Sequence, residues 1–92
     1  MKQKFGKLTF IRVSEDMPIS MRFFDSGFNG IVDATYSQMY GGNDVSKYFL
    51  YKIEGGKVVN KIGWYKENQI TMLDDQDKEK AEQMIEAYNL GG

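Results

Sequence analysis

The segment 57–73 (KVVNKIGWYKENQITML) constrains the fold most, because it has the form of a strand, a polar break and a second strand. Its first half is rich in β-branched and aromatic residues, which favour the pleated, half-buried surface of a sheet. Side chains alternate between the two faces of a strand, so Trp64 shares a face with Val58 and Ile62, while Tyr65 points the other way. The pattern predicts a largely buried Trp64 and a more exposed Tyr65.

Three earlier segments have the same character and are separated by residues typical of turns. Gly55 and Gly56 make the clearest hairpin turn, so the strands on either side of them are expected to pair antiparallel. Gly27 and Gly30 lie within or beside a strand, where glycine marks a bulge, a bend or a close backbone approach. The expected strands are 5–14, 27–38, 47–53, 58–65 and 70–73.

Two connections between the expected strands are distinctive. Segment 39–46 (MYGGNDVS) is rich in Gly, Asn and Asp, which suit positive φ angles and bonds from side chain to backbone. Pro18 is expected to end the first strand, because proline has no N–H to donate. Segment 20–26 (SMRFFDS) has two interpretations: a hydrophobic plug at one end of the core, or a loop that carries function.

The last part of the chain has helical periodicity. Its apolar residues recur at the i, i+3, i+4, i+7 spacing of one helix face. They are Ala81, Met84, Ile85 and Tyr88. Asp74 or Asp75 is placed to cap the N-terminus of a helix over 75–89. An isolated helix of this length is marginal in water, so the stripe is expected to dock on the sheet or on a second subunit of a homo-oligomer.

A chain of 92 residues supports one core, so we expect a single domain over 1–92, with the β region at 5–73. The chain contains neither cysteine nor histidine. This absence excludes disulfides, zinc sites of the usual Cys/His kind, and Ser-His or Cys-His catalysis. We expect no metal, no cofactor and no catalytic residues.

The first residues lack the apolar core of a signal peptide, and about 18 apolar residues never run together. A soluble, cytoplasmic protein without a membrane partner is expected. The charges are unevenly placed: residues 1–12 carry four basic side chains and no acid, whereas 74–92 carry six acids against two lysines. Two interpretations stay open, namely complementarity within the chain or a binding site for a polyanion.

Five short strands, strong bends and a terminal helix predict a mainly β, α+β protein: a small five-stranded antiparallel barrel with a C-terminal α-helix. Segments 30–32 (GIV), 48–51 (YFLY) and 64–70 (WYKENQI) resemble the small SH3-like barrels. The chain also resembles small uncharacterised proteins of phage or prophage type in DSGF, TYSQMYGG and IGWYKENQ. It lacks the acidic specificity loop beside a tyrosine-rich motif with which signalling SH3 domains bind proline-rich ligands.

Thirteen aromatic side chains exceed what so small a core needs, so some of them are expected at the surface. Tyrosine hydroxyls make exposure cheaper than it is for Phe, and the connection 39–46 lies beside several tyrosines. The residues predicted to contact a ligand or partner are Tyr36, Tyr40, Asn43, Asp44 and Tyr65.

This site favours a non-enzymatic protein-interaction module of phage or mobile-element type, acting on an unidentified protein partner through an aromatic surface. A second hypothesis is a small-molecule, nucleotide or nucleic-acid binder, in which Tyr and Trp stack on a base. The near-neutral net charge of −1 weakens the hypothesis of nucleic-acid binding. A third is an enzyme that uses carboxylates, although no spacing fixes two of them at a catalytic distance.

Overall fold

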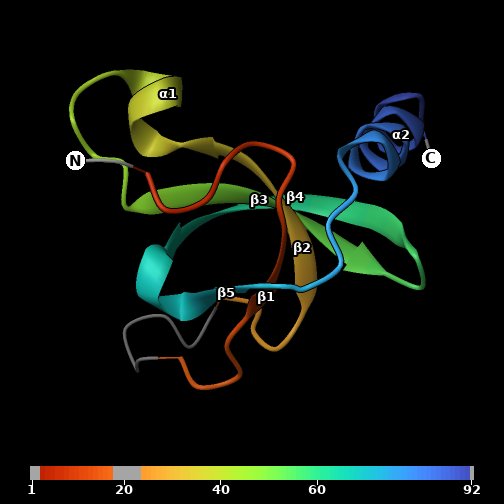
Figure 1. The fold of residues 1–92 in the computed structure, drawn as a ribbon, viewed down its shortest axis with the longest axis horizontal. Coiled ribbons are helices and arrows are strands. Elements are labelled where there is room, and N and C mark those ends of the chain that lie inside the picture. Colours follow the sequence, from red (N-terminus) through yellow and green to blue (C-terminus); the bar gives the residue numbers. More distant parts are fainter. Residues whose placement is uncertain (1–2, 18–23, 92) are drawn as a thin grey trace.

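The computed structural model describes residues 3–17 and 24–91 of the chain. Figure 1 shows a twisted sheet with a short helix near one end and a longer helix at the other. In chain order the elements are β1 (Phe10–Val13), β2 (Asn29–Thr35), α1 (Tyr36–Tyr40), β3 (Lys47–Glu54), β4 (Lys57–Lys66), the 3-10 helix η2 (Glu67–Gln69), β5 (Ile70–Met72) and α2 (Lys78–Asn89). Pro18 and most of the predicted plug or loop at 20–26 lie outside the described residues.

The five strands form one antiparallel sheet in the order β4-β3-β2-β1-β5. β4 and β5 are consecutive in the chain but lie at opposite edges of the sheet, and η2 joins them. The predicted α+β class, with five antiparallel strands and a C-terminal helix, is confirmed. Closure into a barrel is not confirmed, because the strand pairing over the described residues leaves the sheet open between β4 and β5.

β1 is shorter than the predicted strand 5–14, because the chain turns before Phe10. Leu8 has a φ of +69°, a left-handed conformation that is rare for a residue other than glycine. From this turn Leu8 donates its N–H to the carbonyl of Val32 at 2.9 Å. Phe5 reaches the core from outside the strand and is only 2% exposed.

The close backbone approach predicted from Gly30 is confirmed. A Cβ at this position would lie 2.7 Å from the carbonyl oxygen of Tyr51 on β3, so only glycine fits without a shift. The irregularity in β2 falls further along, between Val32 and Ala34, where the register with β3 shifts.

A bulge in β4 reverses the predicted positions of Trp64 and Tyr65. Ile62 and Tyr65 pair with residues of β3 that are only two apart, so Gly63 and Trp64 together take the place of one residue. The extra residue shifts the alternation, and Tyr65 is 1% exposed while Trp64 is half-buried on the opposite face. The prediction that Trp64 is the more buried of the two is therefore wrong. Gly63 is required here, because a Cβ would overlap the ring of Phe49.

The inner face of the sheet carries the larger core cluster. It consists of Phe5, Ile11, Val13, Phe28, Val32, Tyr48, Leu50, Tyr65 and Ile70. Both tyrosine hydroxyls in it bond to the backbone of other segments. Tyr48 Oη accepts from the N–H groups of Lys4 at 2.8 Å and Phe5 at 3.0 Å. Tyr65 donates its hydroxyl proton to the carbonyl of Asp25 at 2.8 Å. The two tyrosines thus hold the segments before β1 and β2 against the sheet.

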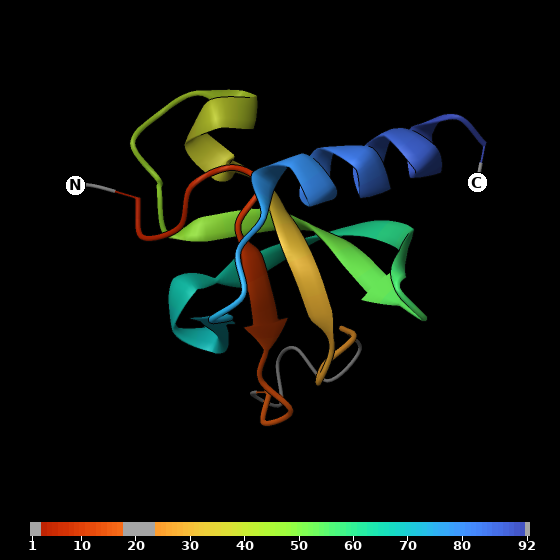
Figure 2. The same ribbon diagram turned by 45° about the vertical axis from the view of Figure 1, so that its right-hand side comes forward.

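α2 covers part of the outer face and docks its apolar stripe there, as predicted. The core cluster between α2 and the sheet consists of Phe10, Ile31, Tyr51, Val58 and Ala81. Met84, Ile85 and Tyr88 of α2 pack against this cluster. Figure 2 shows α2 above the strands, reached by a linker from β5 that passes beside β1. Because the stripe is used within the chain, association of two chains through this helix stays a prediction.

α2 begins at Lys78 with Asp77 as its N-cap, not at 75 with Asp74 or Asp75 as the cap. The Asp77 carboxylate accepts from the N–H of Lys80 at 3.1 Å. The start is delayed because the Gln76 side chain bonds both backbone groups of Phe10, each at 2.8 Å, as a neighbouring strand residue would.

Candidate functional site: an exposed aromatic cluster

α1 exists because Thr35 ends β2 with a capping box. Thr35 Oγ1 accepts from the N–H of Gln38 at 3.2 Å, and Gln38 Oε1 accepts from the N–H of Thr35 at 2.9 Å. This reciprocal pair satisfies two helix-start donors and starts a single helical turn. Gly41, with a φ of +84°, follows the turn. The predicted strand 27–38 is corrected accordingly, since its last three residues belong to α1.

Four aromatic rings meet where α1 faces β3 and β4. This aromatic cluster consists of Tyr36, Tyr40, Phe49 and Trp64. The ring centroids of Tyr36 and Tyr40 are 5.0 Å apart, and each lies 5.4 and 5.7 Å, respectively, from Trp64. The Phe49 ring lies 5.0 Å from Trp64 and supports it from the sheet. Tyr36 is 38% exposed and Tyr40 is 65% exposed, so the cluster presents tyrosine edges to solvent.

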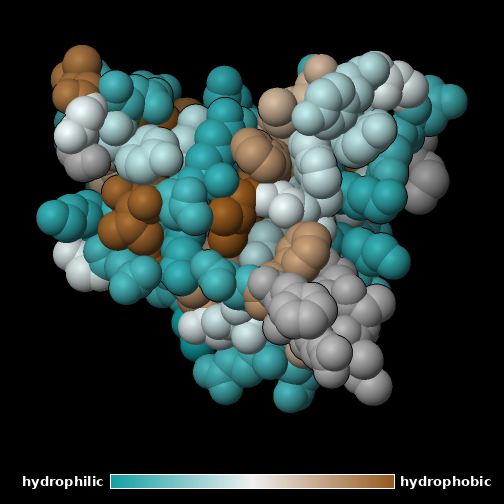
Figure 3. Space-filling model, turned by 180° about the vertical axis from the view of Figure 1, so that it is seen from behind, coloured by the Kyte–Doolittle hydropathy of each residue, from teal (hydrophilic) through white to brown (hydrophobic). Residues whose placement is uncertain are grey.

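The surface around the cluster is not one broad apolar patch. Figure 3 shows the molecule from behind, with brown hydrophobic areas separated by teal polar ones. Pale side chains of intermediate hydropathy gather at the upper right, on the side of α1. Met39, 41% exposed, adds a flexible apolar side chain to α1. The site therefore presents aromatic rings with polar edges and not a wide apolar surface. Such rings can make both apolar contacts and hydrogen bonds with a partner.

Two lysines flank the aromatic cluster. Lys47 Nζ lies 5.9 Å from the centroid of the Tyr36 ring, and Lys61 Nζ lies 5.2 Å from that of Phe49. Lys61 is also paired with Asp33 at 3.2 Å. Partial burial lowers the pKa of Lys61, but the hydrogen bond and charge of Asp33 outweigh it and hold that pKa above its ordinary value. Lys61 is therefore a fixed cation at the border of the cluster.

Four of the five predicted site residues lie in or beside the cluster, in α1 and the connection that follows it. Tyr40 and Tyr36 are exposed ring members, as predicted, and Asn43 is exposed in the connection that follows. Asp44 staples that connection: its Oδ1 accepts from the N–H of Ser46 at 2.9 Å and from its hydroxyl at 2.8 Å. The hydrogen bond from the Ser46 backbone is the main reason why the pKa of Asp44 lies below its ordinary value.

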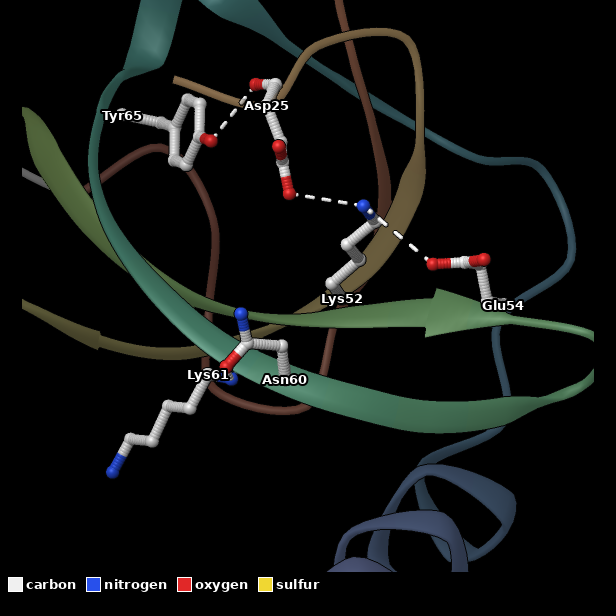
Figure 4. Close-up of polar contacts among 6 residues, drawn as sticks. All are labelled: Asp25, Lys52, Glu54, Asn60, Lys61 and Tyr65. Carbon is white, nitrogen blue, oxygen red and sulfur yellow. Dashed lines mark hydrogen bonds and ion pairs between the residues drawn. The ribbon is translucent and has the colours of Figure 1, made fainter. Parts of the chain in front are cut away.

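Tyr65 is not part of the site, which corrects the prediction for this residue. Its ring lies in the inner core, on the face opposite Trp64, because of the bulge in β4. Burial, reinforced by the charge of Asp25, raises the pKa of Tyr65 to about 12. Figure 4 shows its hydroxyl directed at the Asp25 backbone.

The side chain of Asp25 continues this polar group. Lys52 Nζ lies 2.9 Å from the Asp25 carboxylate and 3.6 Å from Glu54. The hydrogen bond that Lys52 donates to the Asp25 carboxylate is the main reason why the pKa of Lys52 is raised. Figure 4 shows Lys61 extending away from this group. The arrangement holds the segment before β2 on β3. Its lysine is already paired with two carboxylates.

Trp64, Phe49, Lys47 and Lys61 were not predicted as site residues. The signal that could have found Trp64 is the glycine before it, because a glycine inside a strand marks a bulge and a bulge inverts the alternation. The signal for α1 is the spacing of Thr35 and Gln38, which is that of a capping box.

Within residues 3–17 and 24–91 no group of three or more acidic side chains converges as a metal site would require. The helices in the same residues are all too short or too polar to cross a membrane. Comparisons with protein-family models, curated proteins and solved structures find no match for the chain.

Proposed function

We propose that this protein is a non-enzymatic binding module that contacts a protein partner through the aromatic cluster. The observation that carries the proposal is that Tyr36, Tyr40 and Trp64 pack on one another at the surface instead of entering either core cluster. Tyr and Trp combine a large apolar area with a polar edge and dominate the binding energy of protein interfaces.

The support beneath the rings favours recognition. The Thr35–Gln38 capping box fixes the start of α1, and the backbone of Asp44 accepts from the N–H of Ser37 at 2.9 Å, which closes the connection onto the helix. Rings held in place before binding lose little conformational entropy when a partner arrives. The cluster is thus suited to bind without a prior rearrangement.

We also propose that the five strands have an SH3-like arrangement. Three features support it, namely β5 beside β1, the tight β3–β4 hairpin, and the 3-10 turn η2 between β4 and β5. In this arrangement the aromatic cluster lies beside the β2–β3 connection, where variation in loop sequence alters binding without altering the scaffold.

A second candidate, a binder of nucleotides or single-stranded nucleic acid, is favoured by the two lysines beside stacked rings. Both lysines, however, already have carboxylate partners: Lys47 lies 3.6 Å from Asp44, and Lys61 lies 3.2 Å from Asp33. Phosphate binding would have to break these pairs or share the cations. A protein partner requires neither, so the first candidate is preferred.

Trp64 is the only tryptophan, so its fluorescence reports on the cluster directly. We expect the wild type to capture a protein from host lysate that Tyr40→Ala and Trp64→Ala no longer capture, with circular dichroism unchanged. Met72→Ala is the matched control, because Met72 is 49% exposed on β5, away from the cluster. Quenching of Trp64 fluorescence by an oligothymidine would favour the second candidate. Equal capture by all three variants would place the interface elsewhere.

A further inference from the structure

A second concave surface lies between α2 and the outer face of the sheet. It is an open groove of about 420 Å³. The residues that line it, called here the α2 groove, are Lys7, Leu8, Asp33, Tyr51, Glu82, Ile85, Glu86, Asn89 and Leu90. They come from the segment before β1, from β2 and β3, and from α2 with the residue that follows it.

The floor of the α2 groove is apolar and one of its rims is exposed. Tyr51 is 6% exposed and belongs to the cluster on which α2 packs, with half-buried Leu8 and Ile85 beside it. Leu90, the C-cap of α2, is 80% exposed and borders the groove. An apolar side chain from a partner would find contacts on both the floor and this rim.

The carboxylates of the α2 groove are poorly compensated. Glu82 and Glu86 stand one turn apart on α2, where like charges repel. Neither takes part in a salt bridge with any other residue that the structure describes. Asp33 is paired with Lys61, and the one cation among the lining residues is Lys7. A cationic ligand would relieve the repulsion between the two glutamates.

We propose that the α2 groove binds an extended peptide segment in which arginine alternates with leucine. A planar guanidinium has donors on several sides and can bridge carboxylates one helical turn apart, whereas an ammonium acts as a point charge. The leucines on either side would pack on the Leu8–Ile85 floor and on Leu90. The α2 groove and the aromatic cluster have no residue in common, and they border each other at the Lys61–Asp33 pair.

The test is a titration of the ¹⁵N-labelled full chain with the peptide acetyl-Gly-Leu-Arg-Leu-Arg-Gly-amide, followed by NMR. We expect shifts concentrated on the amides of Leu8, Glu82 and Glu86, and weaker binding at high salt, since ions screen surface charges. The variant Glu82→Gln/Glu86→Gln should bind about threefold to tenfold more weakly, the range for two exposed ion pairs. Both substitutions keep the shape of the side chain, and we expect them to leave the fold intact because both positions are exposed.

The matched control is Asp74→Asn/Glu79→Gln, which removes the same charge near α2 but outside the groove. It should bind as the wild type does. Tyr40→Ala should also bind the peptide normally, so failure of the aromatic proposal and failure of this one are distinguishable. Equal binding of the peptide with glutamine in place of arginine, equal loss in the control pair, or shifts on the aromatic cluster would each overturn the inference.

Discussion

Tyr48 and Tyr65 on the inner face of the sheet and Tyr36 and Tyr40 beside α1 are the same residue type in opposite situations. The inner pair are at most 1% exposed, and both hydroxyls bond to the backbone. The outer pair are 38% and 65% exposed, and neither hydroxyl bonds to any residue within the described part of the chain. Ring-to-ring contact occurs in both places, so burial together with a hydroxyl partner separates the structural tyrosines from those available to a partner molecule.

The sharpest test of this comparison is Tyr65→Ala against Trp64→Ala. Tyr65→Ala should lower the free energy of unfolding by about 3–5 kcal/mol, because it leaves a cavity in the core and frees the Asp25 carbonyl. Urea denaturation followed by circular dichroism measures the loss. A midpoint that moved less for Tyr65→Ala than for Trp64→Ala would mean that side chains alternate along β4 without a bulge in solution.

The second test uses pH. The pKa of Tyr65 is raised to about 12 from an ordinary value of 10.0, so the neutral phenol is favoured in the folded state. The resulting stability is complete below pH 10 and declines as pH rises towards 12, by about 2–3 kcal/mol in all. Urea midpoints measured across this range should fall steeply for the wild type.

Tyr65→Phe is the control for the alkaline decline. It should cost about 1 kcal/mol at neutral pH through the lost hydrogen bond, and it should show a shallower decline above pH 10. Tyr51, whose pKa burial also raises, accounts for part of the slope that remains. Parallel curves for Tyr65→Phe and the wild type would mean that Tyr65 is not the group that titrates.

The third test concerns the outer rings. Trp64→Ala should cost about 1–2 kcal/mol and Tyr40→Ala less than about 1 kcal/mol, because the rings lose partner contacts without opening a cavity in either core. Thermal unfolding of both variants checks this. A loss from Tyr40→Ala as large as that from Tyr65→Ala would make the aromatic cluster a part of the core and weaken the proposed function.

The smallest expected effect is at Asp44. Its pKa lies below the ordinary 3.8, chiefly through the Ser46 backbone hydrogen bond, so the stapled connection is fully held above pH 3.8 and is released as pH falls through the lower folded value. The Ser46 amide shift should follow this step in NMR, whereas Asp44→Asn should show no step. An Ser46 shift that is flat with pH in the wild type would mean that the bond is not formed in solution.

The strands could be predicted from the sequence because each is a run of β-branched and aromatic residues between glycine or acidic turns. The face of the sheet to which each side chain points could not be predicted in the same way. Strict alternation places Trp64 inside, and a one-residue bulge next to Gly63 inverts that result without changing composition. Tyr36, Tyr40, Asn43 and Asp44 lie outside the bulged strand and stay predicted contact residues, whereas Tyr65 was assigned to the wrong face.

The helices show the same limit from another side. The stripe on α2 was predicted in full, because periodicity depends only on spacing. The start of α2 could not be predicted, because it depends on hydrogen bonds between the Gln76 side chain and the backbone of Phe10. These two residues are 66 positions apart in the sequence. The aromatic cluster likewise brings rings of α1 into contact with Trp64 of β4, and no local sequence pattern predicts a contact between these two elements.

We expect the irregular path of β4 to limit association between copies of this chain at high concentration. β4 is an edge strand, and a straight, exposed edge invites another chain to add to it and begin aggregation. Register shifts near Val59 and Gly63 interrupt the row of backbone groups, and Lys57, Lys61 and Lys66 add like charges along it. A second β4 would meet mismatched donors and repelling side chains, so the strand that carries Trp64 can stay exposed to partners without assembling into fibrils.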